Sequence, residues 1–213
     1  TRICEDYLRI LRFFRFAAWY GDPGNGLDSD ALTAIADSLD GLDTLSRERV
    51  GAELCKLLAA PDPVMAVAVM ERVGVLFQVL PGATARGLGP LTLHEATLGL
   101  DPDALRRLAA LGIFDGAALR LSKADQRQLA TYQRLVSGDQ SLAEIAWRDG
   151  AEMAFDTAAL RAALFETQLT PDTRDSIKRG AAAQFPVTAQ DLMPDYSGAA
   201  LGEKLRELEA RWI

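Results

Sequence analysis

Acidic and basic side chains recur at helical spacing in the first stretch of this chain, and they are the residues best placed for chemistry. Glu5 and Arg9 are four residues apart, and Asp6 and Arg9 are three apart. On a helix both spacings place the side chains on one face, so the two carboxylates can touch and orient one guanidinium. Arg2 and Arg12 extend this polar stripe. The opposite face, which we expect to be buried, carries Leu8, Ile10, Leu11 and Phe14.

A carboxylate held beside a guanidinium presents hydrogen-bond acceptors and forked donors in fixed directions. A protein needs such groups to read the hydrogen-bonding edge of a nucleobase. A surface helix with ordinary ion pairs, each contributing about 0.3–0.5 kcal/mol, accounts for the same residues. Phe13 and Phe16 flank the stripe, and either can stack under a base or, as we favour, pack against another domain.

A second charged segment covers residues 46–58. Ser46 is a suitable N-cap for a helix that starts there. Arg49 and Glu53 are four residues apart and are expected to pair on one face of that helix. Such a pair can be an ordinary feature of a solvated face, or it can brace a neighbouring helix.

A third segment lies near the end of the chain, where Gly198 and Gly202 precede Lys204. A turn with these glycines presents backbone N–H groups at a helix N-terminus, a geometry suited to an RNA phosphate. A capped amphipathic helix without a ligand explains the segment equally well. Its apolar stripe would consist of Leu201, Leu205, Leu208 and Trp212.

The composition is that of an ordinary globular protein, with 49% hydrophobic and 25% charged residues among 213. No apolar run approaches the roughly 20 residues of a membrane span. No signal peptide is visible, so we predict a cytoplasmic protein without a membrane partner. The net charge of −7 argues against binding nucleic acid through the overall field, so any RNA binding has to use a local basic surface.

Several other residues invite a functional interpretation that we do not favour. Cys4 and Cys55 are expected to be buried, reduced thiols. His94 is the only histidine, so no metal site is expected. The pair of His94 and Glu95 is expected in a loop or at a helix start rather than as a catalytic dyad, and Trp147 is expected in the core.

The hydrophobic pattern predicts an all-α fold. Alternating β-branched segments, the signature of strands, are absent, and alanine and leucine recur at helical spacing. Residues 82–93, rich in glycine and turn formers, are expected to form a linker. Helix breaks are expected at the turn of residues 22–26 and near Gly150. Helices are predicted up to about Tyr20 and over residues 28–38, 45–60, 63–73, 101–111, 122–136, 142–165 and 171–180.

Three of these segments, in the same order along the chain, resemble motifs of the class II tRNA nucleotidyltransferases. This family comprises the CCA-adding enzymes and the related bacterial poly(A) polymerases. The pattern from Glu5 to Phe16 resembles the family's amino-acid template, and residues 46–58 resemble its second neck motif. Residues 185–205 resemble its tail signature but depart from it at Ala189 and Ala199.

The resemblance implies a role for each residue of the template. Asp6 and Arg9 would pair with the Watson–Crick edge of the incoming CTP or ATP. Glu5 would hold this arrangement, and Arg12 would belong to the same nucleotide-binding set.

The resemblance also implies roles for the other two segments. Arg49 and Glu53 would brace the template from the neighbouring helix. Gly198, Gly202 and Lys204 would contact RNA, and the expected partner is the acceptor arm of tRNA.

The architecture implied by the resemblance is an elongated helical array, with a neck over residues 1–81, a body over 82–150 and a tail over 151–213. In the family a catalytic head with paired aspartates precedes the neck and binds Mg²⁺. This chain starts at Thr1, inside the template pattern, and has no Asp-x-Asp motif that follows a Gly-Ser turn, the form the motif takes in the family. We therefore expect a headless segment that has no catalytic residues and is inactive alone, whereas the full-length enzyme would use Mg²⁺, CTP and ATP.

Two alternatives remain open at this stage. A poly(A) polymerase would add only A, although such proteins usually carry a basic C-terminal extension, and this chain ends with the mixed-charge residues 207–213. A helical adaptor that binds a protein partner would explain the acidic balance and the helical composition without any nucleotide. Titration with CTP and ATP separates the adaptor from the enzyme segment.

Overall fold

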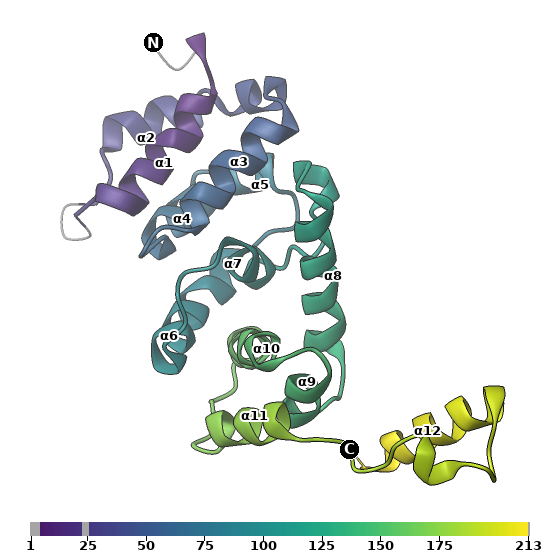
Figure 1. Ribbon diagram of the computed structural model, residues 1–213. Helices are drawn as coiled ribbons and strands as arrows, with labels where there is room; N and C mark the ends of the chain where they lie inside the picture. Colours follow the sequence, from purple (N-terminus) through teal and green to yellow (C-terminus); the bar gives the residue numbers. More distant parts are fainter. Residues whose placement is uncertain (1–4, 23–25, 213) are drawn as a thin grey trace. The chain divides into compact units, whose positions relative to one another are not determined.

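The computed structural model describes residues 5–22 and 26–212, apart from the side chain of residue 210. Within these ranges all regular secondary structure is helical and no strand occurs (Figure 1). The all-α prediction is therefore confirmed. Arg2, Cys4 and the centre of the turn at residues 22–26 lie outside the described residues. Cys55 is half-buried and free.

Twelve longer helices and several short 3₁₀ turns follow one another along the described part of the chain. The α-helices are α1 (Leu8–Tyr20), α2 (Ser29–Ala36), α3 (Arg47–Leu58), α4 (Val64–Arg72), α5 (Val75–Val79), α6 (Leu88–Leu98), α7 (Ala104–Ala110), α8 (Lys123–Ser137), α9 (Leu142–Arg148), α10 (Ala151–Leu164), α11 (Thr173–Ala182) and α12 (Gly198–Trp212). The 3₁₀ turns are η2 (Leu39–Thr44), η3 (Ala85–Gly87), η4 (Ala117–Leu119) and η5 (Gln190–Leu192).

Short polar side chains start several of these helices. The Asp28 carboxylate accepts hydrogen bonds from two N–H groups in the first turn of α2, and the Ser46 hydroxyl accepts one, from Arg49, in the first turn of α3. Such caps satisfy N–H groups that have no partner inside the helix. Both starts were expected from the sequence and are confirmed. The predicted break near Gly150 is also confirmed, since this residue has φ +95° between α9 and α10.

The chain divides into two compact units. The first unit comprises Thr1–Asp139 with Asp156–Pro171, and the second comprises Gln140–Phe155 with Asp172–Ile213. Neck, body and tail are functional assignments that compactness does not test, so the division at residues 81 and 150 remains a prediction.

In the first unit, α1 packs against α3 and α4. The predicted apolar face of α1 is buried, with Leu8, Ile10, Leu11 and Phe14 at most 3% exposed. In α3, Leu54, Leu57 and Leu58 are also buried. This packing confirms the expected core and leaves the polar stripe of α1 on the outside.

The predicted linker at residues 82–93 is wrong, because η3 and the first half of α6 occupy most of it. One of its glycines, Gly87, serves close packing instead of a flexible connection. A Cβ at Gly87 would lie 2.4 Å from the backbone oxygen of Ala110, a separation that no side chain tolerates. Leu88 and Leu91 of the same segment are fully buried.

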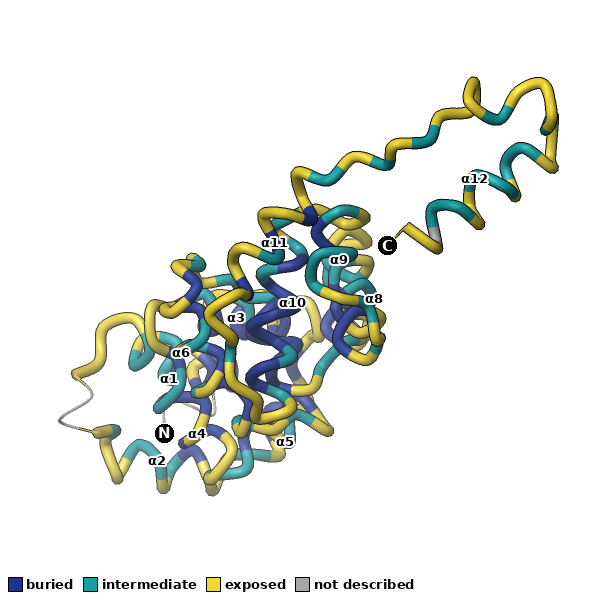
Figure 2. The backbone as a smooth tube through the Cα atoms, turned by 90° about the horizontal axis from the view of Figure 1, so that it is seen from below, coloured by how far each residue is buried: buried dark blue, intermediate teal, exposed yellow. Residues whose placement is uncertain are grey.

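In the second unit, α9 packs against α11, and the backbones approach closely at Gly180. Trp147 is half-buried at the edge of the α9–α11 pair rather than in its core. Its ring packs edge-on against that of Trp212, with the ring centres 5.4 Å apart. Figure 2 shows that the stretch between α11 and α12 is mainly exposed. The expected apolar stripe of α12 is only half-buried at Leu201, Leu205 and Leu208.

Candidate nucleotide-template site

The expected pair between Glu5 and Arg9 is present at the N-terminal end of α1. Arg9 Nη1 donates to Glu5 Oε2 at 3.0 Å, and both side chains are exposed to solvent. Glu5 precedes the helix, which begins at Leu8. The Glu5 carboxylate therefore approaches the Arg9 guanidinium from the segment that precedes α1.

Asp6 is held by a residue far away in the sequence. Arg49 Nη2 of α3 donates to both carboxylate oxygens of Asp6, at 3.1 and 3.0 Å. Asp6 Oδ1 also accepts from the backbone N–H of Leu8 at 3.1 Å. The bond from the Leu8 N–H and the charge of Arg49 hold the pKa of Asp6 below its usual value. This carboxylate therefore stays ionised and fixed in direction.

Glu53 forms a second connection between α3 and α1. It is only 5% exposed, and its carboxylate lies 2.8 Å from Arg15 Nε and 3.9 Å from Arg12 Nε. The short contact with Arg15 does not have hydrogen-bond geometry, so it is a contact of opposite charges only. Lys56 Nζ, at 3.5 Å, also faces this carboxylate. Such positive neighbours offset the cost of burying a charged carboxylate.

The predicted pair between Arg49 and Glu53 within α3 is therefore wrong. Both side chains instead reach away from α3: Arg49 meets Asp6 just before α1, and Glu53 meets Arg15 within α1. Helix packing supplies partners that the spacing along one helix cannot reveal. We call these two contacts the cross-helix brace.

The arrangement leaves donors and acceptors side by side at the surface. A carboxylate offers about four lone-pair sites, and three of those of Asp6 accept the bonds described above. Arg9 and Arg12 are half-exposed on the same stripe of α1. The site can therefore offer one fixed acceptor together with several guanidinium donors to a planar polar ligand.

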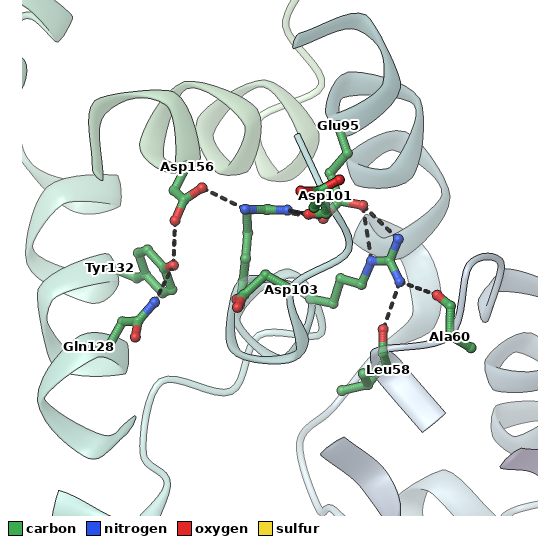
Figure 3. Close-up of polar contacts among 10 residues, drawn as sticks. Leu58, Ala60, Glu95, Asp101, Asp103, Gln128, Tyr132 and Asp156 are labelled. Carbon is green, nitrogen blue, oxygen red and sulfur yellow. Dashed lines mark hydrogen bonds and ion pairs between the residues drawn. The ribbon is translucent and has the colours of Figure 1, made fainter. Parts of the chain in front are cut away.

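A network of buried charges anchors the far end of α3 (Figure 3). Arg107 Nη1 donates to the backbone oxygen of Leu58 at 2.7 Å and also to that of Ala60. These carbonyls lie at the C-terminus of α3, where the helix cannot satisfy them itself. Arg107 thereby fixes the end of the helix that carries the cross-helix brace.

Glu95 connects the two adjacent arginines of α7. Its Oε2 accepts from Arg107 Nε and Nη2 at 3.0 and 2.8 Å, and its Oε1 accepts from Arg106 Nε at 2.9 Å. Glu95 is 3% exposed, and both arginines are buried as well. One carboxylate therefore neutralises part of the charge of two buried guanidinium groups.

The network continues from Arg106 into α10 and α8. Arg106 Nη1 donates to Asp156 Oδ1 at 2.6 Å, and the Tyr132 hydroxyl donates to Asp156 Oδ2 at 2.6 Å. Gln128 in turn donates to the Tyr132 oxygen at 2.8 Å. Burial lowers the pKa of Arg106, but Asp156 and Glu95 raise it more, so this guanidinium stays charged. Burial beside Asp156 raises the pKa of Tyr132 well above its usual value.

Sequence reasoning missed this network. His94 and Glu95 were expected in a loop or at a helix start, but both lie inside α6. One signal was available, namely two adjacent arginines, Arg106 and Arg107, within the apolar segment of residues 104–110. Consecutive charges on an alanine- and leucine-rich helix indicate that at least one of them is buried.

The residues expected to contact RNA lie in the second unit. Gly198, with φ +54°, begins α12, and Gly202 lies one turn further along. Lys204 Nζ pairs with Glu207 at 2.9 Å and lies 6.0 Å from the centre of the Tyr196 ring. These contacts position Lys204, and its role toward RNA remains a prediction.

Comparison with known proteins points to one group of enzymes. A family model described as "Probable RNA and SrmB-binding site of polymerase A" matches residues 26–86. The human protein "CCA tRNA nucleotidyltransferase 1, mitochondrial" is 49% identical over 57 residues, which are 27% of this chain and 13% of that protein. Its namesake from Danio rerio is 28% identical over 238 residues, covering 99% of this chain and 52% of that protein.

Solved structures agree at the level of the fold. "The complex structure of CCA-adding enzyme with ATP" matches 95% of this chain and 55% of that chain, with a TM-score of 0.60 at 14% identity. A structure described as the complex with CTP gives a TM-score of 0.57. The chain thus spans about half the length of the proteins that it matches along its whole extent. The family resemblance predicted from the three motifs is confirmed.

Proposed function

We propose that this chain, as a segment of a class II tRNA nucleotidyltransferase, selects CTP and ATP and binds tRNA in a CCA-adding enzyme. In the intact enzyme, Asp6 and Arg9 would contact the base of the incoming nucleotide, with Arg12 beside them. The cross-helix brace is the observation that carries the proposal. It fixes Asp6 through Arg49 while Glu5 holds Arg9, so an acceptor and a donor are presented together.

The chemistry of the bases explains why such a pair selects two nucleotides of four. Cytosine and adenine each present an amino donor beside a ring-nitrogen acceptor on the Watson–Crick edge. A carboxylate can accept from that amino group while a guanidinium donates to the ring nitrogen. Uracil and guanine present the reverse order, so their groups would face like groups of the protein. Buried polar groups left unpaired in this way are costly, which gives discrimination.

We propose that this segment does not carry out nucleotidyl transfer by itself. The described residues contain no group of three or more His, Cys, Asp or Glu side chains that could hold a metal ion. Nucleotidyl transfer requires metal ions that stabilise the attacking and leaving oxygens. In this proposal the metal is bound by a catalytic head outside this chain, and the segment contributes nucleotide choice and tRNA binding.

The tRNA contact is proposed on the tail segment. Gly198, Gly202 and Lys204 would bind a phosphate of the acceptor arm, with Lys204 as the charged group. Replacing Lys204 with alanine should weaken tRNA binding and reduce its salt dependence by about one ion. Equal salt dependence in both proteins would contradict this role.

Nucleotide titration of the 213-residue chain tests the template proposal. CTP and ATP should bind more tightly than UTP and GTP, and Arg9→Ala should weaken CTP and ATP binding by about 10- to 100-fold, as expected for one charge-assisted hydrogen bond. Arg86→Ala is the matched control, because Arg86 is an exposed arginine of the same unit that is paired with Glu166. Equal binding of all four nucleotides, or equal effects of the two variants, would contradict the template.

The same titration separates the alternatives. Binding of ATP without CTP would favour an A-adding polymerase, and binding of neither would favour the adaptor.

No helix in the described part is long and apolar enough to cross a membrane. We propose a cytoplasmic location, which cell fractionation can test, since the human relative carries "mitochondrial" in its name.

A further inference from the structure

An aromatic cluster lies at the C-terminal end of α1, on the same helix as the template. Phe16 is 51% exposed, Trp19 is 42% exposed and Tyr20 is 77% exposed. We call these three residues the α1 aromatic patch. Large aromatic side chains gathered at the surface in this way usually mark a binding site.

One hydrogen bond and two ring contacts orient the rings of the patch. The Trp19 indole N–H donates to the backbone oxygen of Lys56 at 2.8 Å, which ties the patch to α3. The rings of Phe16 and Tyr20 are inclined by 30° with their centres 6.0 Å apart. The guanidinium of Arg15 lies over the Phe16 ring at 4.5 Å. A ligand that stacks on these rings would therefore lose little side-chain freedom on the protein side.

The surroundings of the patch are basic. Arg12, Arg15 and Lys56 face a single carboxylate, that of Glu53. This excess of positive charge suits an anionic ligand, whereas a purely apolar partner would have to desolvate these cations. Aromatic rings combined with positive side chains are the means by which proteins bind unpaired nucleotides.

The patch is also aligned with the template. Phe16 and Tyr20 follow Arg9 by seven and eleven residues, spacings that return to the same face of a helix. At a rise of 1.5 Å per residue, the Cα atoms of Arg9 and Tyr20 are about 16 Å apart along the axis. A few unpaired nucleotides can bridge this distance, so an RNA end bound at the patch would approach a nucleotide bound at Arg9.

We infer that the α1 aromatic patch is a stacking site for the unpaired nucleotides at the 3′ end of an RNA. The inference deepens the proposed function and rests on it for the identity of the RNA. The ligand class is single-stranded RNA with an unpaired end, recognised through base faces and phosphates without readout of base edges.

Fluorescence anisotropy of the 213-residue chain with labelled RNA hairpins tests this inference. One hairpin carries three unpaired nucleotides at its 3′ end, a second is blunt, and a third carries abasic residues in the overhang. The double variant Phe16→Ala/Tyr20→Ala should bind the hairpin with the overhang about 5- to 100-fold more weakly. Binding of the blunt and abasic hairpins should change by less than about twofold, since neither offers a base to stack.

Two further variants serve as controls. Phe77→Ala removes an aromatic ring of α5 that is 71% exposed, and it should leave all three affinities unchanged. Phe16→Leu/Tyr20→Leu keeps an apolar surface but removes the rings, and it should lose overhang binding as the alanine variant does. Retained binding in the leucine variant would overturn stacking in favour of simple apolar contact. Failure of the chain to distinguish the three hairpins would also overturn the inference.

The outcome is separable from that of the proposed function. If Phe16→Ala/Tyr20→Ala weakens binding of the overhang hairpin while Arg9→Ala leaves the affinities for CTP and ATP unchanged, the patch is supported and the template is contradicted. If Arg9→Ala weakens CTP and ATP binding while Phe16→Ala/Tyr20→Ala leaves overhang binding unchanged, the template is supported and the patch is contradicted. Circular dichroism of each variant establishes that the helical fold is intact.

Discussion

Replacing Glu95 with glutamine should lower the free energy of unfolding of the first unit by about 3–5 kcal/mol. Glutamine has nearly the same volume, so the change removes charge without leaving a cavity. It also replaces one of the two carboxylate oxygens that accept from Arg106 and Arg107, in bonds of 2.8–3.0 Å, with an NH₂ group that can only donate. The two guanidinium groups would then be buried with less neutralising charge, and a buried charge without compensation is strongly destabilising.

An exposed ion pair gives the scale for comparison. Arg86 and Glu166 form a pair on the surface of the same unit. Glu166→Gln should cost less than about 1 kcal/mol, because water screens the charges and the side chains lose entropy when they pair.

Urea unfolding followed by tryptophan fluorescence measures these differences. The chain has three tryptophans, and Trp147 and Trp212 belong to the second unit. Replacing both with phenylalanine leaves Trp19 as a reporter of the first unit. The midpoint should fall while the slope stays constant, as expected for a change in stability alone. If Glu95→Gln and Glu166→Gln shift the midpoint equally, the charge network does not anchor this unit.

Three further predictions concern the template and the activity of the isolated chain. In the intact enzyme, Asp6→Ala should reduce discrimination against UTP and GTP by about 1.5–3 kcal/mol, with little change in melting temperature. If the variant keeps its selectivity but has a clearly lower melting temperature, Asp6 is a structural residue. The isolated chain should incorporate no labelled CMP or AMP into tRNA with or without Mg²⁺, and incorporation by rigorously purified protein would refute its inactivity. Because the pKa of Asp6 is lowered, its ion pair in the cross-helix brace stabilises the fold at pH values above the usual aspartate pKa. This stabilisation is lost as the pH falls through the lowered pKa. An NMR titration of the Asp6 carboxyl should therefore show a midpoint below that of an unstructured peptide, and Arg49→Ala should raise it; a midpoint unchanged by Arg49→Ala would contradict the brace.

The sequence alone determined the features that depend on local spacing. The buried face of α1 follows from apolar residues at helical intervals, and it is found as expected. The starts at Asp28 and Ser46 and the break at Gly150 follow from the conformational preferences of single residues. The pair of Glu5 and Arg9 is four residues apart, so one turn of helix is enough to form it.

The tertiary structure alone decided the partners of the remaining charges. Asp6 and Arg49 are 43 residues apart, and Arg106 and Asp156 are 50 apart. Helical periodicity shows which face a side chain occupies, but the helix that packs against that face supplies the partner. The same limit explains the error at Gly87, where the lack of a side chain indicates close packing as readily as a flexible turn. The pair of Arg106 and Asp156 forms because burial makes an unpaired charge costly, and that cost is set by packing that a linear pattern does not contain.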